Sequence, residues 1–217
     1  MLVDSTPTHP VPDAATTPLV RVVDDEPAIQ ALFERIGRQC GFEVLCHGTA
    51  ASFLTGFETD RPGCLVIDLM LPDRSGIEVL QEVTRRGSEL PVVFMSGMAR
   101  VSEAVQALKL GSIDFVEKPF DVQHITTVLR RAVDLDLKRR RRDADHDELR
   151  RRFESLTKRE TEVMEQIVRG AANKEVAAAL GLSHKTVEVH RANVMRKTMA
   201  GSLAELVRMH VAVAGER

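Results

Sequence analysis

The sequence predicts two domains of different class, an α/β domain with a five-stranded parallel sheet and a smaller all-α domain behind it. Over residues 19–135, short apolar runs alternate five times with segments of helical periodicity, a pattern that requires a parallel sheet with helices on both faces. From Thr157 onward, four short helical segments follow one another without any strand pattern between them. The length of 217 residues suits two small domains.

The α/β domain is expected to alternate strand and helix along the chain. Its five strand candidates are short apolar runs at residues 19–24, 42–47, 64–68, 91–95 and 113–117. The intervening and following helices are expected to begin at Pro27, Ala51, Gly76, Val101 and Phe120. The run CLVID at 64–68 is apolar up to its last residue, as a strand buried on both faces must be.

Residues 1–18 are predicted to form a disordered tail, because they are rich in Pro, Thr and Ala and can bury little apolar surface. They lack the basic start and apolar centre of a secretory signal. No apolar run approaches the roughly 20 residues that a membrane span needs, so no membrane partner is expected. The spacing of the three cysteines, Cys40, Cys46 and Cys64, matches neither a metal-binding pair nor a redox pair. Unpaired cysteines fit a reducing compartment, so a cytoplasmic location is expected.

The small net charge of the chain conceals an asymmetry between its two parts. Residues 1–137 contain 12 Lys and Arg against 20 Asp and Glu, a balance of −8. Residues 138–217 contain 18 against 12, a balance of +6, and the two parts together give the net −2. An acidic part joined to a basic part suggests a cation-binding module linked to a nucleic-acid-binding one.

Polar residues gather where the predicted parallel strands end, which is where such sheets bind ligands. Asp24 and Asp25 follow the first strand, Asp68 ends the third, Ser96 follows the fourth and Lys118 follows the fifth. Three adjacent carboxylates repel one another unless a cation lies between them or one takes up a proton, and oxygen ligands suit Mg²⁺. A carboxylate can also attack phosphorus, and a lysine and a hydroxyl then stabilise the transferred group.

Four motifs in this order and spacing, VVDDEP, VIDLMLPDRSG, VVFMSG and DFVEKPF, resemble the receiver domain of two-component response regulators over about residues 19–135. The resemblance implies a flavodoxin-like (βα)5 fold and phosphorylation of Asp68 by a histidine kinase. It also implies that Asp25, Asp68 and the backbone carbonyl of Met70 bind Mg²⁺ directly, and that Asp24 acts through a water. Such a domain catalyses only its own phosphoryl transfer and dephosphorylation.

The same resemblance assigns the remaining receiver residues. Lys118 would pair with the phosphoryl oxygens, while Ser96 and Phe115 would move together as the switch. For Phe115 the alternative is an ordinary core aromatic. Met70 and Met98 stand where relatives govern access of the hydrolytic water, and two apolar side chains there lead us to expect a long-lived phosphoryl group.

The second domain, residues 153–217, follows a charged segment at 136–152 that is predicted to be a solvated helical linker within a continuous helix over 121–155. Thr157 and Glu160 form a capping box for the first helix. An Ala-rich helix ends at Gly181, and Ser183 caps the next, longer helix. Two helices joined by this short turn predict a helix-turn-helix.

The stretch NKEVAAALGLSHKTVEVHRANVMRKTMAGSLAELVRM resembles the LuxR-type helix-turn-helix, and together with the receiver it indicates the FixJ-like group. The resemblance implies that Glu188, Val189 and Ala192 face the DNA bases and that Lys185, Thr186, His190 and Arg191 lie near the backbone or the base edges. Arg196 and Lys197 are further basic residues of this helix that are expected to contact DNA. A pair between Glu188 and Arg191, and burial of His190, remain possible for those residues. The last helix, from Ser202 to Val211, would form a dimer contact through Leu203, Leu206 and Val207, unless these residues simply pack on the neighbouring helix.

The sequence therefore predicts a regulator that forms a homodimer when phosphorylated, binds promoter DNA and acts on RNA polymerase. Three different functions remain open. An acid phosphatase could use Asp68 as its nucleophile, although such enzymes usually carry a second acid where Met70 stands. The receiver could instead respond to a small ligand without phosphorylation. The helix-turn-helix also looks similar to that of a sigma-type promoter module, which the attached receiver argues against.

Overall fold

The computed structural model describes residues 17–97 and 101–215, except for the side chains of residues 101–104. The chain divides into two compact units between Arg140 and Arg141. The predicted linker, 136–152, thus begins inside the first unit, where Asp136 accepts a hydrogen bond from the Gly63 N–H.

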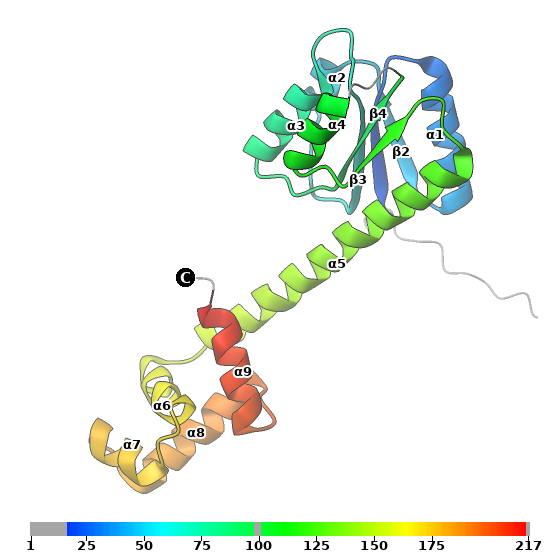
Figure 1. Ribbon diagram of the computed structural model, residues 1–217. Helices are drawn as coiled ribbons and strands as arrows, with labels where there is room; N and C mark the ends of the chain where they lie inside the picture. Colours follow the sequence, from blue (N-terminus) through cyan, green and yellow to red (C-terminus); the bar gives the residue numbers. More distant parts are fainter. Residues whose placement is uncertain (1–16, 98–100, 216–217) are drawn as a thin grey trace, which may run out of the picture. The chain divides into compact units, whose positions relative to one another are not determined.

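The first unit contains a parallel five-stranded sheet with the strand order β2-β1-β3-β4-β5 (Figure 1). The strands are β1 (Leu19–Val23), β2 (Glu43–His47), β3 (Gly63–Asp68), β4 (Val92–Ser96) and β5 (Asp114–Glu117). The helices are α1 (Pro27–Cys40), α2 (Ala50–Thr55), α3 (Gly76–Arg85), α4 (Val101–Lys109) and α5 (Val122–Glu154). The predicted fold class and the alternation of strand and helix are confirmed.

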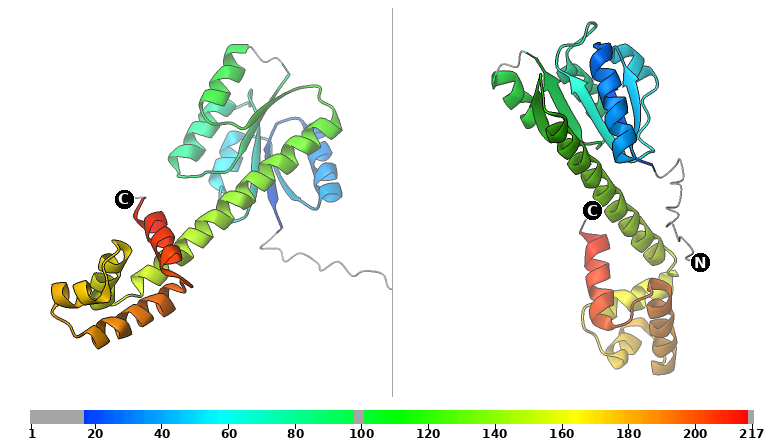
Figure 2. Two further views of the ribbon diagram at one scale, coloured as in Figure 1. Left: turned by 60° about the horizontal axis from the view of Figure 1, so that its bottom comes forward. Right: turned by 90° about the vertical axis from the view of Figure 1, so that its right-hand side faces the viewer.

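Helices cover both faces of this sheet, and each face has its own apolar core (Figure 1, Figure 2). On one face, Phe33 of α1 and Leu129 of α5 pack against the strands. On the other, Phe53 of α2 and Leu80 of α3 do so. All residues of β1, β3 and β4 are buried, as expected for the strands between two helical layers.

Helix α5 is continuous over 33 residues and passes through the predicted linker. Its early residues, among them Ile125, Leu129 and Ala132, are buried against the sheet. Asp136 is the last of its buried residues. The prediction of a continuous helix over 121–155 is confirmed.

The second unit contains four further helices, α6 (Lys158–Val168), α7 (Asn173–Leu180), α8 (His184–Thr198) and α9 (Leu203–Ala214). The capping box of Thr157 and Glu160 is present, and Ser183 caps α8 by accepting a hydrogen bond from the Thr186 N–H. Gly181 ends α7 in the left-handed conformation, with φ at 66°, which favours glycine. One core holds the helices together, and it includes Val163, Ile167, Val187, Val194 and Leu206.

Among the described residues, no helix combines the length and the apolar character that crossing a membrane requires. The three cysteines are free thiols. Burial raises the pKa of Cys64 to about 12 and is the main cause that raises the pKa of Cys46 to about 11. Because the thiolate is the reactive form, these two residues act as apolar side chains.

Leu206→Ala should destabilise the second unit, because Leu206 is completely buried among all four of its helices. Removing a buried leucine side chain typically lowers the free energy of unfolding by about 2–5 kcal/mol. Urea unfolding followed by circular dichroism measures the change. Val211→Ala is the matched control on the same helix, since Val211 is 62% exposed, and equal effects of the two substitutions would contradict the assignment of Leu206 to the core.

Candidate functional site

Three carboxylates meet at the carboxyl end of the sheet. Asp24 directly follows β1 and Asp68 ends β3, and these two strands are paired with Val23 opposite Ile67. Oxygen atoms of Asp24, Asp25 and Asp68 lie within 4.8 Å of one another. Asp24 is fully buried and Asp68 nearly so, whereas Asp25 is exposed. The sheet topology therefore brings together the three acids that the sequence singled out.

Lys118, which follows β5, reaches across to this cluster. Its ammonium donates hydrogen bonds to Asp24 Oδ2 at 2.7 Å and to Asp68 Oδ2 at 2.6 Å. It also donates to Glu26 Oε1 at 2.8 Å. Glu26 was not singled out from the sequence, and the available signal was its position directly after the two aspartates.

Burial and hydrogen bonding shift the pKa values of Asp24 and Lys118 in opposite directions. Burial raises the pKa of Asp24, although hydrogen bonds from Lys118 and from the Glu26 backbone counteract it. For Lys118, burial alone would lower the pKa, but its hydrogen bonds to Asp24, Asp68 and Glu26 outweigh this and raise it. Lys118 therefore remains a cation at neutral pH.

The Lys118 ammonium pairs with three carboxyl groups, those of Asp24, Glu26 and Asp68, and Asp25 lies beside two of them. One positive charge among four acids leaves the cluster with excess negative charge. The donor atoms are all oxygens, the ligand type that hard divalent cations prefer. Since unbalanced carboxylates at these distances repel one another, the residues present fit a divalent metal ion.

The loop after Asp68 is fixed at several points. The Met70 N–H donates to Asp68 Oδ1 at 2.9 Å and so orients the carboxylate. Asp73 accepts the N–H groups of Ala50 at 3.0 Å and Ala51 at 2.8 Å, which ties the loop to the first turn of α2. The Met70 side chain is 72% exposed, and Met98 lies outside the described residues.

Gly76, the first residue of α3, packs directly against the backbone of Asp68. A β-carbon at this position would lie 2.4 Å from the Asp68 carbonyl oxygen, which is far inside contact distance. The Gly76 N–H donates to the Leu69 carbonyl at 2.9 Å. From the sequence, Gly76 was only the expected start of a helix, because a close approach between two backbones leaves no local signal.

Ser96 and Phe115 lie beside the cluster on β4 and β5. Ser96 ends β4, is 1% exposed, and accepts the Lys118 backbone N–H through its carbonyl at 2.8 Å. Phe115 is half-buried at the margin of the core on the α2 and α3 side. This position is compatible with both the switch and the core aromatic that were considered for Phe115.

A second candidate surface lies on α8 in the other unit. Its exposed residues include Lys185, Glu188, Val189, Ala192 and Arg196, and its half-buried ones include Thr186, His190 and Arg191. The apolar Val189 is 54% exposed, which is unusual for a valine with a purely structural role. Basic side chains around an exposed apolar residue on a helix that follows a tight turn are typical of a DNA-recognition helix.

Two family models match the chain. The model for the response regulator receiver domain matches residues 20–130, and the model for bacterial regulatory proteins of the luxR family matches residues 154–210. The chain belongs to the response regulators. The receiver of this regulator implies a histidine kinase as partner, and its LuxR-type domain implies DNA binding.

Full-length relatives share both domains of the regulator. The transcriptional regulatory protein FixJ of Azorhizobium caulinodans is 42% identical over 191 residues, which cover 88% of this chain and 90% of that protein. The structure of the response regulator StyR is 36% identical with a TM-score of 0.84 and covers 90% of this chain and 98% of its own. Full-length FixJ from B. japonicum is 34% identical with a TM-score of 0.56, over 93% and 100% of the two chains. The chain is a FixJ-like transcription regulator.

Within the regulator, two predicted DNA contacts have partners inside the protein. The Lys197 ammonium donates to Glu160 Oε2 at 2.6 Å and to the Ser155 carbonyl at 3.1 Å, so it joins α8 to the capping box of α6. Arg191 donates to Asn173 Oδ1 at 3.1 Å and joins α8 to α7. Both residues therefore have a structural contact inside the unit, and their contact with DNA stays a prediction.

Glu188 and His190, two further residues of α8, have contacts that bear on their predicted roles. Glu188 lies 3.5 Å from His184 Nδ1, one turn earlier, and this contact replaces the suggested pair with Arg191. His190 is half-buried, and its Nδ1 atom is buried without a hydrogen-bond partner among the described residues. Half-burial of His190 is compatible with both the DNA contact and the buried role that were considered for it.

The predicted dimer contact on α9 needs a correction. Leu206 is 0% exposed and belongs to the core of its own unit, so its side chain is inaccessible to a second copy. Leu203 and Val207 are half-buried. For Leu206, packing on the neighbouring helices is the role that the structure supports.

Gly76→Ala should disturb the acidic site, because the added methyl group collides with the backbone of Asp68. Overpacking of this kind costs about 1–3 kcal/mol of folding free energy, and we also expect weaker Mg²⁺ binding in a titration followed by calorimetry. Gly48→Ala is the control, since its nearest heavy atom would be 3.8 Å away. Unchanged stability and Mg²⁺ affinity in Gly76→Ala would contradict this account.

Glu160→Gln should lose stability above about pH 5, where the carboxyl group is ionised in both the folded and the unfolded protein. Hydrogen bonds from Lys197 and from the Thr157 backbone hold the pKa of Glu160 at about 2, against an ordinary value of 4.5. A depressed folded-state pKa stabilises the fold above the unfolded pKa, and this contribution disappears as the pH falls toward the folded pKa. The difference in unfolding free energy between the two proteins should be largest at neutral pH and shrink between about pH 5 and pH 2.

The control for this measurement is Glu165→Gln, since Glu165 lies on the exposed side of the same helix. Its unfolding free energy should run parallel to that of the unsubstituted protein over the whole range. A difference for Glu160→Gln that stays constant from neutral to acid pH would show that the Glu160–Lys197 pair contributes no ionic stabilisation.

Proposed function

We propose that a histidine kinase transfers a phosphoryl group to Asp68 and that this modification promotes dimerisation and sequence-specific binding to promoter DNA. The observation that carries the proposal is the position of Asp68. Its carboxylate is held by Lys118 at 2.6 Å and by the Met70 N–H at 2.9 Å, beside two further aspartates. An oriented carboxylate next to a fixed cation is suited to accept a phosphoryl group.

In the proposed step, a carboxylate oxygen of Asp68 forms a bond to phosphorus while the bond between phosphorus and the kinase histidine breaks. Lys118 starts within hydrogen-bond distance of Asp68 and is placed to shift its donors to the phosphoryl oxygens. Asp24, Asp25, Asp68 and the Met70 carbonyl would hold Mg²⁺. When bound, Mg²⁺ would neutralise negative charge on the transferred group.

We further propose that Ser96 and Phe115 convey the modification to the receiver surface. Ser96 adjoins Lys118 through a backbone hydrogen bond, and Phe115 is not fully packed in the core, so both residues have a reason to respond to new charge at Asp68. Met70 stands where an acid phosphatase would carry its second acid, which favours a regulator that turns over only its own phosphoryl group. The protein would act in the cytoplasm, together with RNA polymerase at the promoter.

Incubation with acetyl phosphate and Mg²⁺ tests the proposal directly. The intact protein should gain about 80 Da, the mass of one phosphoryl group, and its dimeric fraction should rise in sedimentation analysis. Asp68→Asn should abolish both changes. Asp145→Asn, an exposed acid in the other unit, is the control and should behave like the unsubstituted protein. Phosphorylation of Asp68→Asn, or modification without any change in dimerisation, would contradict the proposal.

Lys185→Ala should weaken DNA binding and reduce its salt dependence. Lys185 is an exposed cation in the first turn of α8, where a recognition helix meets DNA. Loss of one phosphate contact lowers the slope of log affinity against log salt by about 1. Fluorescence anisotropy with a mixed-sequence duplex measures this slope. Lys109→Ala, an exposed lysine in the receiver, should leave it unchanged, and equal slopes for all three proteins would remove α8 from the DNA interface.

A further inference from the structure

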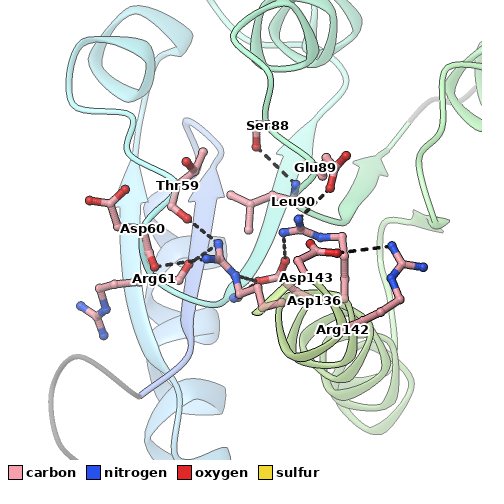
Figure 3. Close-up of polar contacts among 12 residues, drawn as sticks. Thr59, Asp60, Arg61, Ser88, Glu89, Leu90, Asp136, Arg142 and Asp143 are labelled. Carbon is pink, nitrogen blue, oxygen red and sulfur yellow. Dashed lines mark hydrogen bonds and ion pairs between the residues drawn. The ribbon is translucent and has the colours of Figure 1, made fainter. Parts of the chain in front are cut away.

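Three charged residues of α5 lie at the end of the sheet opposite to the acidic site, in the segment predicted as a solvated linker. They are Asp136, Arg139 and Arg140, and we name them the helix clamp. Figure 3 labels Asp136 of this clamp together with Thr59, Asp60 and Glu89 from the loops beside it. All three belong to the first compact unit, although the receiver family model ends at residue 130. Their contacts are too buried and too numerous for a solvated linker.

Asp136 is the centre of the clamp. Its side chain is 0% exposed, and its two oxygens accept three hydrogen bonds. Arg139 Nη2 donates to Oδ1 at 2.6 Å, while Arg140 Nε and the Gly63 N–H donate to Oδ2 at 2.7 Å and 2.9 Å. A fully buried carboxylate persists only with such partners, so removing it would leave two arginines and a backbone N–H without their acceptor.

The two arginines extend these contacts to the loops that precede β3 and β4. Arg140 donates to the backbone carbonyls of Thr59, of Asp60 at 3.2 Å and of Arg61 at 3.1 Å. Arg139 donates to Glu89 Oε2 at 2.7 Å. The clamp therefore connects one helix to the starting points of the two strands that end in Asp68 and Ser96.

The absence of a side chain at Gly63 allows the backbone of β3 to lie close to its neighbours at the clamp. Gly63 is the first residue of β3, and a β-carbon there would lie 1.9 Å from the Leu19 carbonyl oxygen of β1. The backbone of β3 is thus held between β1 on one side and Asp136 on the other. Asp68 is the last residue of β3, and every residue of this strand is buried. Because close packing resists local adjustment, a displacement of the backbone at Asp68 is transmitted along the strand to Gly63.

We propose that the helix clamp makes α5 part of the receiver as far as Arg140 and transmits the state of Asp68 to the following helical segment, residues 141–154. This inference rests on the proposed function, because it assigns a route for the signal that phosphorylation starts. The route runs from Asp68 along β3 to Gly63, and from Gly63 through Asp136 to α5. Arg141 is then the first residue of α5 that belongs to the second unit.

Hydrogen exchange of the full-length protein, followed by mass spectrometry of its peptides, tests this route. The probe is Mg²⁺ with beryllofluoride, which imitates the phosphoryl group on Asp68. Unsubstituted protein is compared with Asp136→Asn and with Arg140→Met. The second substitution removes the carbonyl contacts and one donor to Asp136, but it leaves the carboxylate with Arg139 and the Gly63 N–H. Asp134→Asn is the matched control, because it makes the same change on an exposed position of the same helix.

Without the probe, Asp136→Asn should exchange the amides of residues 59–63 roughly tenfold to a hundredfold faster, the range that loss of a hydrogen bond to a charged group implies. With the probe, unsubstituted protein and Asp134→Asn should change protection both at residues 68–76 and at residues 141–154. Asp136→Asn and Arg140→Met should keep the first change and lose the second.

Two results would overturn the inference. One is a response of residues 141–154 that persists in a variant whose residues 59–63 have lost protection. The other is an unsubstituted protein whose residues 68–76 respond to the probe while residues 141–154 do not. If residues 68–76 themselves fail to respond, the proposed function is contradicted, and the signalling role of the clamp falls with it.

Discussion

Buried negative charge at the carboxyl end of a parallel sheet is the constraint on which the receiver depends. The sheet topology places Asp24 and Asp68 side by side in the interior, and their repulsion would destabilise the fold without compensation. Lys118 supplies one positive charge at hydrogen-bond distance from both. The remaining negative charge makes the site receptive to a divalent cation and ties its chemistry to the packing of β1, β3 and β5.

A second buried carboxylate, that of Asp136 on α5, lies at the opposite end of β3, and its negative charge is compensated in a different way. Asp68 shares one ammonium with other acids, whereas Asp136 is surrounded by two guanidinium groups and a backbone N–H. The first arrangement has excess negative charge and can take up a cation. The second has a donor for each of its oxygens, so it needs no added cation, and it holds α5 against the start of β3.

The second unit separates residues that hold the fold from residues that remain available to a partner. Lys197 and Arg191 bind Glu160 and Asn173 and so connect α8 to α6 and α7. Lys185 and Arg196 stay exposed near Val189 on the same helix. A helix that must present side chains to DNA needs such internal anchors, because base contacts require a defined orientation of the helix.

The sequence by itself determined the two domain classes, the order of the elements, and the acids and lysine at the strand ends. Periodicity and the position of a residue after a strand are local properties, and the parallel-sheet rule converts them into proximity. Only the tertiary structure decided the roles of Glu26, Gly76, Asp136, Lys197 and Leu206. Each depends on which distant segment packs against it, and the charge or apolarity of one side chain is the same whether it faces water, DNA or another helix.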